Sequence, residues 1–305
     1  MTLLLAPEGF VIGVAVCHLN RGNGEFLLAA YRQLKANFSQ YQLVLQSVCA
    51  GVRSPMTTSQ ASLTDALTAK SKHVWFYAGM GCLAIAFTIA GFAPGLIDTQ
   101  ARLAPLTPVL AIHGAVFFAW LLLFLAQTML IQAGKIAVHR RLGMSSAILA
   151  AAMVVLGYWI TIAMARRGYD LSGDLAARSD PAAAIAFPLL DIAMFASLYV
   201  AACLFRRQPA VHKRLMLLAV VAGLMPASVT HLLGHFSFFQ DKLFLTPVLV
   251  GAFLAASAAY DRIALHRIHP VSLWVPLFVF ALENVYFAVV IPSRAWHAFA
   301  AKLMR

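Results

Sequence analysis

The sequence predicts an all-α, polytopic transmembrane helical bundle with seven spans. Of the 305 residues, 62% are hydrophobic and only 11% are charged, and the mean hydropathy is +0.81. A chain with so many apolar side chains cannot bury them in one soluble core. Its apolar runs are about twice the roughly 10 residues of a membrane barrel strand and are apolar on all sides. Helices are then the remaining way to cross a bilayer.

The segment 1–55 is predicted to be an upstream extension of the natural protein. Its first apolar stretch is interrupted by Pro7 and Glu8, lacks a basic leader, and is too short to cross a bilayer of about 30 Å. Met56 then opens a Ser/Thr-rich stretch, 56–73, which is typical of the polar leader before a first span. We therefore expect translation of the natural protein to start at Met56.

The remainder, 74–305, is the predicted seven-span domain. Each apolar run is long enough to cross a bilayer with some tilt. Prolines within the runs are compatible with this, because neighbouring helices satisfy the backbone groups that a proline frees. Small residues four apart, such as Ala147 and Ala151, let helix backbones approach closely. The predicted spans are 74–94, 108–133, 142–165, 183–205, 215–233, 243–260 and 271–292.

The basic residues predict the orientation. The net charge of +12 comes mainly from short loops between apolar runs, so we predict no nucleic-acid partner. Counted from Met56, eleven basic residues lie on the side of the leader and eight on the other side. The densest short loops, KIAVHRR and RRQPAVHKR, are both on the leader side. The chain is thus predicted to be a multi-pass protein of the bacterial inner membrane, with the leader cytoplasmic and the C-terminus outside.

Five ionisable residues fall inside the predicted spans or at their ends, where a charge is costly and needs an explanation. The alternation of the spans places all five in one leaflet. Two of the histidines are four residues apart on one helix face, which is the spacing that offers two imidazoles to one metal. The five residues are His113, Asp191, His231, His235 and Glu283.

Three classes of function remain open from these residues. The first is a haem-binding or redox membrane protein with His113 and His231 as axial ligands of a haem b. The second is a zinc-dependent membrane hydrolase, in which His113, His231 and His235 bind zinc and Asp191 or Glu283 acts as the base. The third, which we favour, is a non-enzymatic membrane protein. Its polar groups hold the bundle together or bind membrane lipid or a partner of unknown kind.

The loops on the leader side hold a second group of polar residues. His139 in HRRLG opens the third predicted span, and His212 in HKRLM opens the fifth. We interpret each motif as an interfacial element whose basic side chains meet lipid phosphates while its leucine enters the lipid. Asp261, at the end of the sixth span, is expected to pair with Arg262 or with an arginine of a loop.

Several strings resemble an uncharacterised family of bacterial multi-pass membrane proteins. They are HGAVFFAWLLLFLAQ, HRRLGM, HKRLMLLA, AYDRIALHRIHPVSLW and SRAWHAFA. The resemblance covers about residues 75–305, and HRRLG followed by HKRLM is its most specific part. It implies a helical bundle but no particular substrate or reaction, and 1–55 has no counterpart in it.

Two more distant likenesses concern cofactors. Histidines embedded in antiparallel spans are similar to those of b-type di-haem membrane cytochromes, which carry two histidines on one helix about four turns apart. Here Gln127 stands four turns after His113, so the likeness leaves at most one haem site. The pair of His231 and His235 is also similar to the HxxxH of membrane zinc hydrolases such as alkaline ceramidases. In that superfamily the pair lies in the last span, whereas here it lies in the fifth.

Overall fold

The computed structural model describes residues 60–98, 106–167, 180–236, 238 and 245–305, and the side chains from Trp75 onward among them. The expected upstream extension at 1–55 and the expected start at Met56 lie outside the described residues. The second part of the predicted leader is helical from Gln60 and runs without a break into the first span.

Seven helices are long and apolar enough to cross a membrane, which confirms the predicted all-α, seven-span fold class of an integral membrane protein. The described residues contain no strand. The spanning helices are α2 (Gln60–Ile97, spanning from Trp75), α3 (Pro108–Gln132), α4 (Ile136–Arg166), α5 (Pro181–Leu204), α6 (Pro209–Gly234), α7 (Leu245–Ala264) and α8 (Pro270–Val285), which the π-helical turn η2 (Tyr286–Val290) extends.

Besides α2, two helices begin six residues earlier than the hydropathy predicted. The helix α4 starts at Ile136 rather than 142, and α6 starts at Pro209 rather than 215. The reason is that HRRL and HKRL are themselves helical, since Arg, Lys and Leu are good helix formers. Pro209 occupies the first turn, where its missing N–H costs nothing. Hydropathy identifies only the part of a helix that lies in the hydrocarbon of the bilayer. It does not identify the helical turns that lie in the headgroup region.

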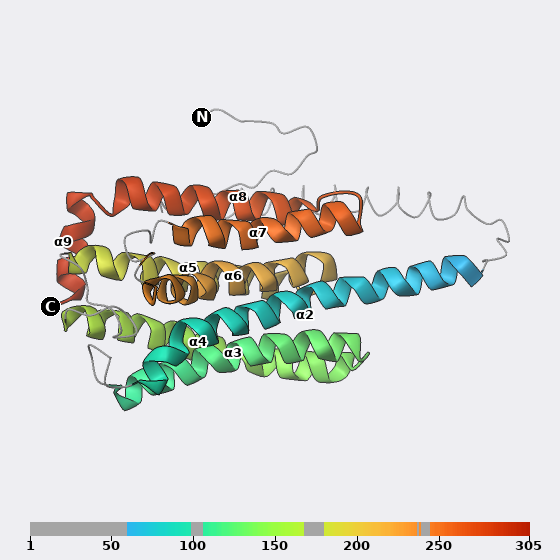
Figure 1. Cartoon of the computed structure of the whole chain (residues 1–305), viewed down its shortest axis with the longest axis horizontal. Coiled ribbons are helices and arrows are strands. Elements are labelled where there is room, and N and C mark those ends of the chain that lie inside the picture. The colour runs from blue at the N-terminus through green and yellow to red at the C-terminus, as the bar shows by residue number, and fades with distance from the viewer. Residues whose placement is uncertain (1–59, 99–105, 168–179, 237, 239–244) are drawn as a thin grey trace, which may run out of the picture. The chain divides into compact units, whose positions relative to one another are not determined.

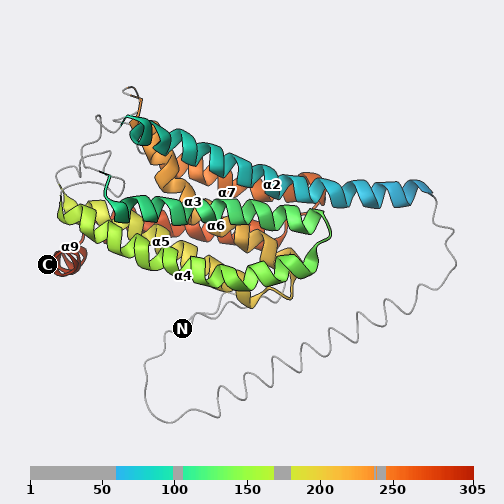
Figure 2. The same ribbon diagram turned by 90° about the horizontal axis from the view of Figure 1, so that it is seen from below.

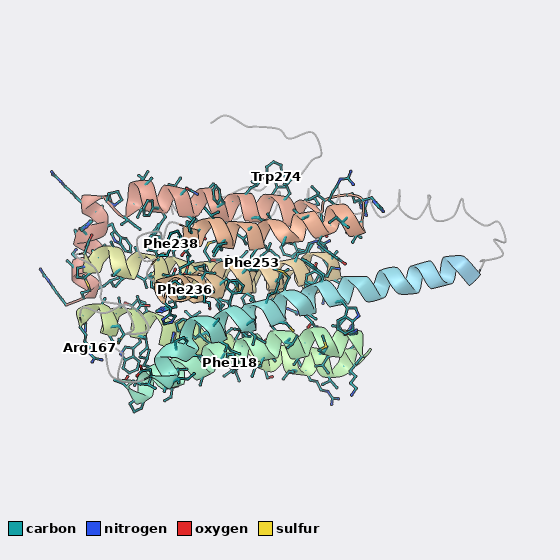
Figure 3. All side chains as sticks on the ribbon, viewed as in Figure 1. Phe118, Arg167, Phe236, Phe238, Phe253 and Trp274 are labelled. Atoms are coloured by element: carbon teal, nitrogen blue, oxygen red, sulfur yellow. The ribbon has the colours of Figure 1, made fainter. Side chains whose placement is uncertain are left out.

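The helices form a closed ring with two helices packed outside it. Around the ring, α2 packs against α3, α3 against α4, α4 against α5, α5 against α6, and α6 against α2. The helices α7 and α8 then cover the outer side of α6 (Figures 1 and 2). The helix α6 is consequently the innermost, with 72% of its apolar window buried, against 11% for α8. The side chain of Trp274 on α8 stands away from the bundle (Figure 3), as expected of a lipid-facing surface.

Two glycines permit the closest helix contacts of α6. A Cβ atom at Gly223 would lie 2.5 Å from Cβ of Phe195 on α5. A Cβ atom at Gly91 on α2 would lie 2.6 Å from the carbonyl oxygen of Ser228. Next to the second contact, the hydroxyls of Thr88 and Ser228 are 2.9 Å apart. Small residues therefore set the spacing of the ring, as is usual where lipid provides no hydrophobic drive between helices.

A short amphipathic helix, α9 (Arg294–Leu303), crosses one end of the bundle (Figure 1). Hydropathy does not predict this helix, because ten amphipathic residues do not form an apolar run. Its signal is the helical spacing of Trp296, Phe299, Ala300 and Leu303, of which Trp296 and Ala300 are buried.

We call this end of the bundle the α9 end, and the opposite end the basic end. The basic end holds the turns between α3 and α4, between α5 and α6, and between α7 and α8. Its described basic residues, which define the name, are Lys135, Arg140, Arg141, Arg206, Arg207, Lys213, Arg214, Arg262 and Arg267.

Candidate functional site

The deepest of the predicted ligands, His113, is buried on α3. Its side chain is 8% exposed, and its ring lies 4.2 Å from the ring of Phe117, one turn further along the same helix. Its Nδ1 atom has no hydrogen-bond partner among the described residues. A buried imidazole nitrogen in this state calls for an explanation, and it is the one feature of the structure that favours a ligand at His113.

The other two predicted histidines face α2 instead of α3. The ring of His231 lies 4.5 Å from the ring of Phe92, and His235 Nε2 donates a hydrogen bond to the carbonyl oxygen of Gly91 over 2.6 Å. The helices α3 and α6 both pack against α2 but are not a packed pair themselves. The pairing of His113 with His231 on one haem stays a prediction, and this arrangement does not favour it.

The two predicted carboxyl groups, Asp191 on α5 and Glu283 on α8, are both half-buried. They do not complete a metal site. Within the described residues, no three His, Cys, Asp or Glu side chains lie close enough together to hold a metal ion. The expected zinc set of His113, His231, His235, Asp191 and Glu283 is therefore not assembled in this structure. The sequence places these residues at one depth, but depth does not say which helices are neighbours.

The structure instead brings together the two histidines of the basic motifs. The motifs form a repeat, AVHRRL at 137–142 and AVHKRL at 210–215, and each begins a helix in the same direction. The rings of His139 and His212 lie 6.5 Å apart. His212 Nδ1 donates to the carbonyl oxygen of Ala202 over 2.8 Å. With its amide assigned from the hydrogen-bond network, Gln127 donates to His139 Nδ1 over 2.6 Å and accepts from the N–H of Gly143 over 3.0 Å.

The arginine in the second copy of the repeat, Arg214, is fully buried and forms an ion pair. Arg214 donates from Nε to Asp261 Oδ2 over 3.0 Å and to Ser272 Oγ over 2.9 Å. Its Nη2 donates to Asp261 Oδ1, and its Nη1 donates to the carbonyl oxygen of Ala210 over 2.7 Å. The pair joins α6, α7 and α8. This confirms the expected partner of Asp261 as an arginine of a loop motif, whereas Arg262 contacts the carbonyl oxygen of His266.

His269 connects this ion pair to the start of α8. Its backbone N–H donates to Asp261 Oδ2 over 3.2 Å, and its Nδ1 accepts from the N–H of Val271 over 3.2 Å, which caps the helix. Burial lowers the pKa of His269, and the positive charge of Arg214 lowers it further. Both effects keep the imidazole neutral, which is the form that can accept the capping hydrogen bond.

The first copy of the repeat differs from the second in the state of its arginine. Arg141 occupies the position equivalent to Arg214, yet it is exposed and has no ion pair among the described residues. Arg140 and Lys135 beside it are also exposed and unpaired by the same measure. This corner of the basic end therefore carries three cations that no described carboxylate neutralises.

A groove opens on the lipid-facing side between α3 and α4, next to that corner. It is shallow and open to the outside, with a volume of about 410 Å³. Nothing in the periodicity of the sequence indicates it, because it depends on how the two helices pack together. Its walls include Ala119, Leu122 and Ala126 of α3 and Leu142, Ser145 and Leu149 of α4.

At the α9 end, three side-chain hydrogen bonds hold α9 against the bundle. Trp296 Nε1 donates to the carbonyl oxygen of Ala182 over 2.8 Å. Arg166 Nη2 donates to the carbonyl oxygen of Leu303 over 3.0 Å. His297 Nε2 and Asp180 Oδ2 are 3.0 Å apart and form a half-exposed ion pair when the imidazole is protonated.

The attachment of α9 is expected to depend on pH. The hydrogen bonds to the Ser293 carbonyl and to Asp180 raise the pKa of His297 above its ordinary 6.5. Partial burial raises the pKa of Asp180, but the hydrogen bonds from His297 and from backbone N–H groups outweigh it and hold that pKa below 3.8. The ion pair thus contributes between about pH 4 and 6.5, and it weakens as pH rises through the pKa of His297 or falls through that of Asp180.

Amide hydrogen exchange of α9 measures this dependence. After correction for the intrinsic effect of pH, protection of 294–303 should be higher at pH 5.5 than at pH 8.5. In a His297→Gln variant the difference should disappear, because glutamine keeps a hydrogen bond but has no charge. Equal pH dependence in both proteins would show that the pair does not hold α9.

Comparison of the chain with protein-family models, with curated proteins and with solved structures found no match. The resemblance to a bacterial multi-pass family therefore stays a prediction.

Proposed function

We propose that this chain is a non-enzymatic integral membrane protein that binds anionic lipids at its basic end. The observation that supports the proposal is the charge of that end. Its described side chains include the nine basic residues named above and a single carboxylate, Asp261, which is already paired with Arg214. A surplus of cations in the headgroup region attracts anionic lipid by about 1 kcal/mol for each Lys or Arg.

The same charge supports an orientation. Short loops rich in Lys and Arg remain on the cytoplasmic side, where the leaflet surface is negative. We propose that the basic end faces the cytoplasm of a bacterial inner membrane and that α9 lies outside. Alkaline phosphatase fused after Arg305 should then be active in a bacterial host, and activity only of fusions in the α5–α6 turn would reverse the assignment.

Removal of the exposed arginines should reduce lipid selectivity. We expect Arg140→Gln with Arg141→Gln to lower the retention of phosphatidylglycerol relative to phosphatidylcholine roughly 30-fold, since two charges account for about 2 kcal/mol. Native mass spectrometry of protein released from nanodiscs with equal amounts of the two lipids measures the ratio. Selectivity should also fall at high salt, which screens exposed charges.

The matched control removes two exposed charges from the α9 end, with Arg294→Gln and Lys302→Gln. Its net charge equals that of the basic-end variant, so a general effect of charge would lower selectivity equally in both. An unchanged ratio in the basic-end variant, or an equal fall in the two variants, would contradict the proposal.

One observation favours a second candidate function, the binding of a haem. The buried Nδ1 of His113 lacks a partner among the described residues, and an imidazole nitrogen is a common axial ligand of haem iron. An optical spectrum of the purified protein tests this directly. A Soret band that disappears in a His113→Ala variant would support haem binding, and no band after expression with added haem would exclude it.

A further inference from the structure

We propose that the α3–α4 groove is the site of one ordered anionic phospholipid, with an acyl chain in the groove and its phosphate at Lys135 and Arg141. This inference rests on the proposed function and names a specific site for it.

The groove owes its shape to small residues on α3. Ala119 and Ala126 are seven residues apart and both line it, so they lie about 10 Å apart along the helix axis. Alanine has no atoms beyond Cβ to fill the space between the helices. The opposite wall contains Leu142 and Leu149, also seven residues apart, on α4. The result is a channel that is elongated along the helices, as a hydrocarbon chain requires.

The polar atoms in the walls are already satisfied. Ser145 Oγ donates to the carbonyl oxygen of Leu142 over 2.9 Å, and Ser146 Oγ donates to that of Gly143 over 2.6 Å. Ser146 Oγ also lies 3.3 Å from the hydroxyl of Tyr199 on α5. The channel therefore presents mainly aliphatic surface, and its occupant in this stretch is expected to be apolar.

A cationic rim lies at the basic end of the same channel. Arg141 directly precedes the wall residue Leu142, and Lys135 is at the start of the same helix. One guanidinium group can donate two parallel N–H hydrogen bonds to the oxygens of one phosphate. An apolar groove that ends in cations matches a lipid chain that ends in a phosphate.

The depths along α4 follow the order of groups in a phospholipid. With a rise of 1.5 Å per residue, Ser145 lies about 6 Å and Leu149 about 12 Å below Arg141. A phosphate at Arg141 thus places the ester region near Ser145 and the start of the acyl chain near Leu149. The α5–α6 hairpin has no such arrangement, because the equivalent arginine, Arg214, is inside the protein and neutralised by Asp261.

Filling the groove tests the inference. Ala126→Phe places a ring in the channel, and Ala255→Phe places the same ring on an exposed position of α7 outside it. In native mass spectrometry from mixed nanodiscs, the wild type and Ala255→Phe should retain one phosphatidylglycerol at collision energies that remove the others. Ala126→Phe should lose this last lipid, with occupancy reduced about tenfold, and Ala119→Phe should repeat the result at the other end of the channel. Thermal unfolding confirms that each variant is folded.

The outcomes separate the two proposals. If Ala126→Phe and Ala119→Phe both retain the last lipid, the groove is not its site, while a loss of selectivity in the Arg140/Arg141 variant would still support the proposed function. If the basic-end variant keeps full selectivity, the proposed function fails and the groove proposal fails with it. A last lipid that is as often phosphatidylcholine as phosphatidylglycerol would overturn the role of the cationic rim.

Discussion

An Asp261→Asn variant is expected to lose about 3 to 5 kcal/mol of unfolding free energy. Asparagine has nearly the same shape, so the change removes the negative charge and leaves Arg214 buried without a counter-charge. Breaking a buried pair on one side costs about this much. Arg214 is 1% exposed and Asp261 0%, so water does not replace the lost partner. Reversible unfolding by sodium dodecyl sulfate in mixed micelles measures the difference.

Two further variants identify the cause. Arg262→Gln, one residue away on the exposed side of α7, should change the unfolding free energy by less than about 0.5 kcal/mol. Arg214→Met combined with Asp261→Leu removes both charges and should recover most of the loss, because apolar replacements of buried ion pairs are commonly tolerated. If Asp261→Asn is as stable as Arg262→Gln, the ion pair does not hold α6, α7 and α8 together.

The second large effect is expected at the contact of α5 and α6. Gly223→Ala should lower the unfolding free energy by about 1 to 3 kcal/mol, the usual cost of overpacking. The new methyl group would lie 2.5 Å from Cβ and 3.0 Å from Cα of Phe195. Backbone atoms of a helix cannot turn aside as the end of a flexible side chain can, so the two helices must separate.

Gly114→Ala is the matched control, since no atom lies within 4 Å of a Cβ built at Gly114 on α3. There the substitution should stabilise the helix by about 0.5 to 1 kcal/mol, because alanine loses less backbone entropy than glycine. The same unfolding measurement applies to both variants. Equal effects of the two substitutions would mean that helix propensity, and not the close contact, decides the outcome.

The fold could be predicted from the sequence because lipid imposes a simple rule on it. Any apolar run of about 20 residues must form a helix, so the seven spans follow from hydropathy alone. The start of α4 at Ile136 could not be read in this way, since its first turns are basic and lie in the interface. The helix α9 was missed because its ten residues bury only one face.

The candidate site was harder to predict because hydropathy gives depth along a helix but not the order of helices around a bundle. His113 and His231 share a leaflet, yet α2 packs against both of their helices and the ring of His231 faces Phe92. For Asp261 the sequence offered two kinds of partner, and only the packing of α6 against α7 selected Arg214. The groove is lined by residues of both α3 and α4, and no local pattern encodes how these two helices pack together.

The ion pair between α6 and α7 also bears on how the chain is synthesised. Asp261 follows Arg214 by 47 residues. At about 5 to 20 residues per second, Arg214 leaves the ribosome roughly 2 to 10 s before its partner exists. During this interval its long side chain can keep its charge in the headgroup region, so we expect α6 to reach its final depth only when α7 has been inserted. The innermost helix of the bundle, α6, thus takes its final position only after α7, which is synthesised later, has been inserted.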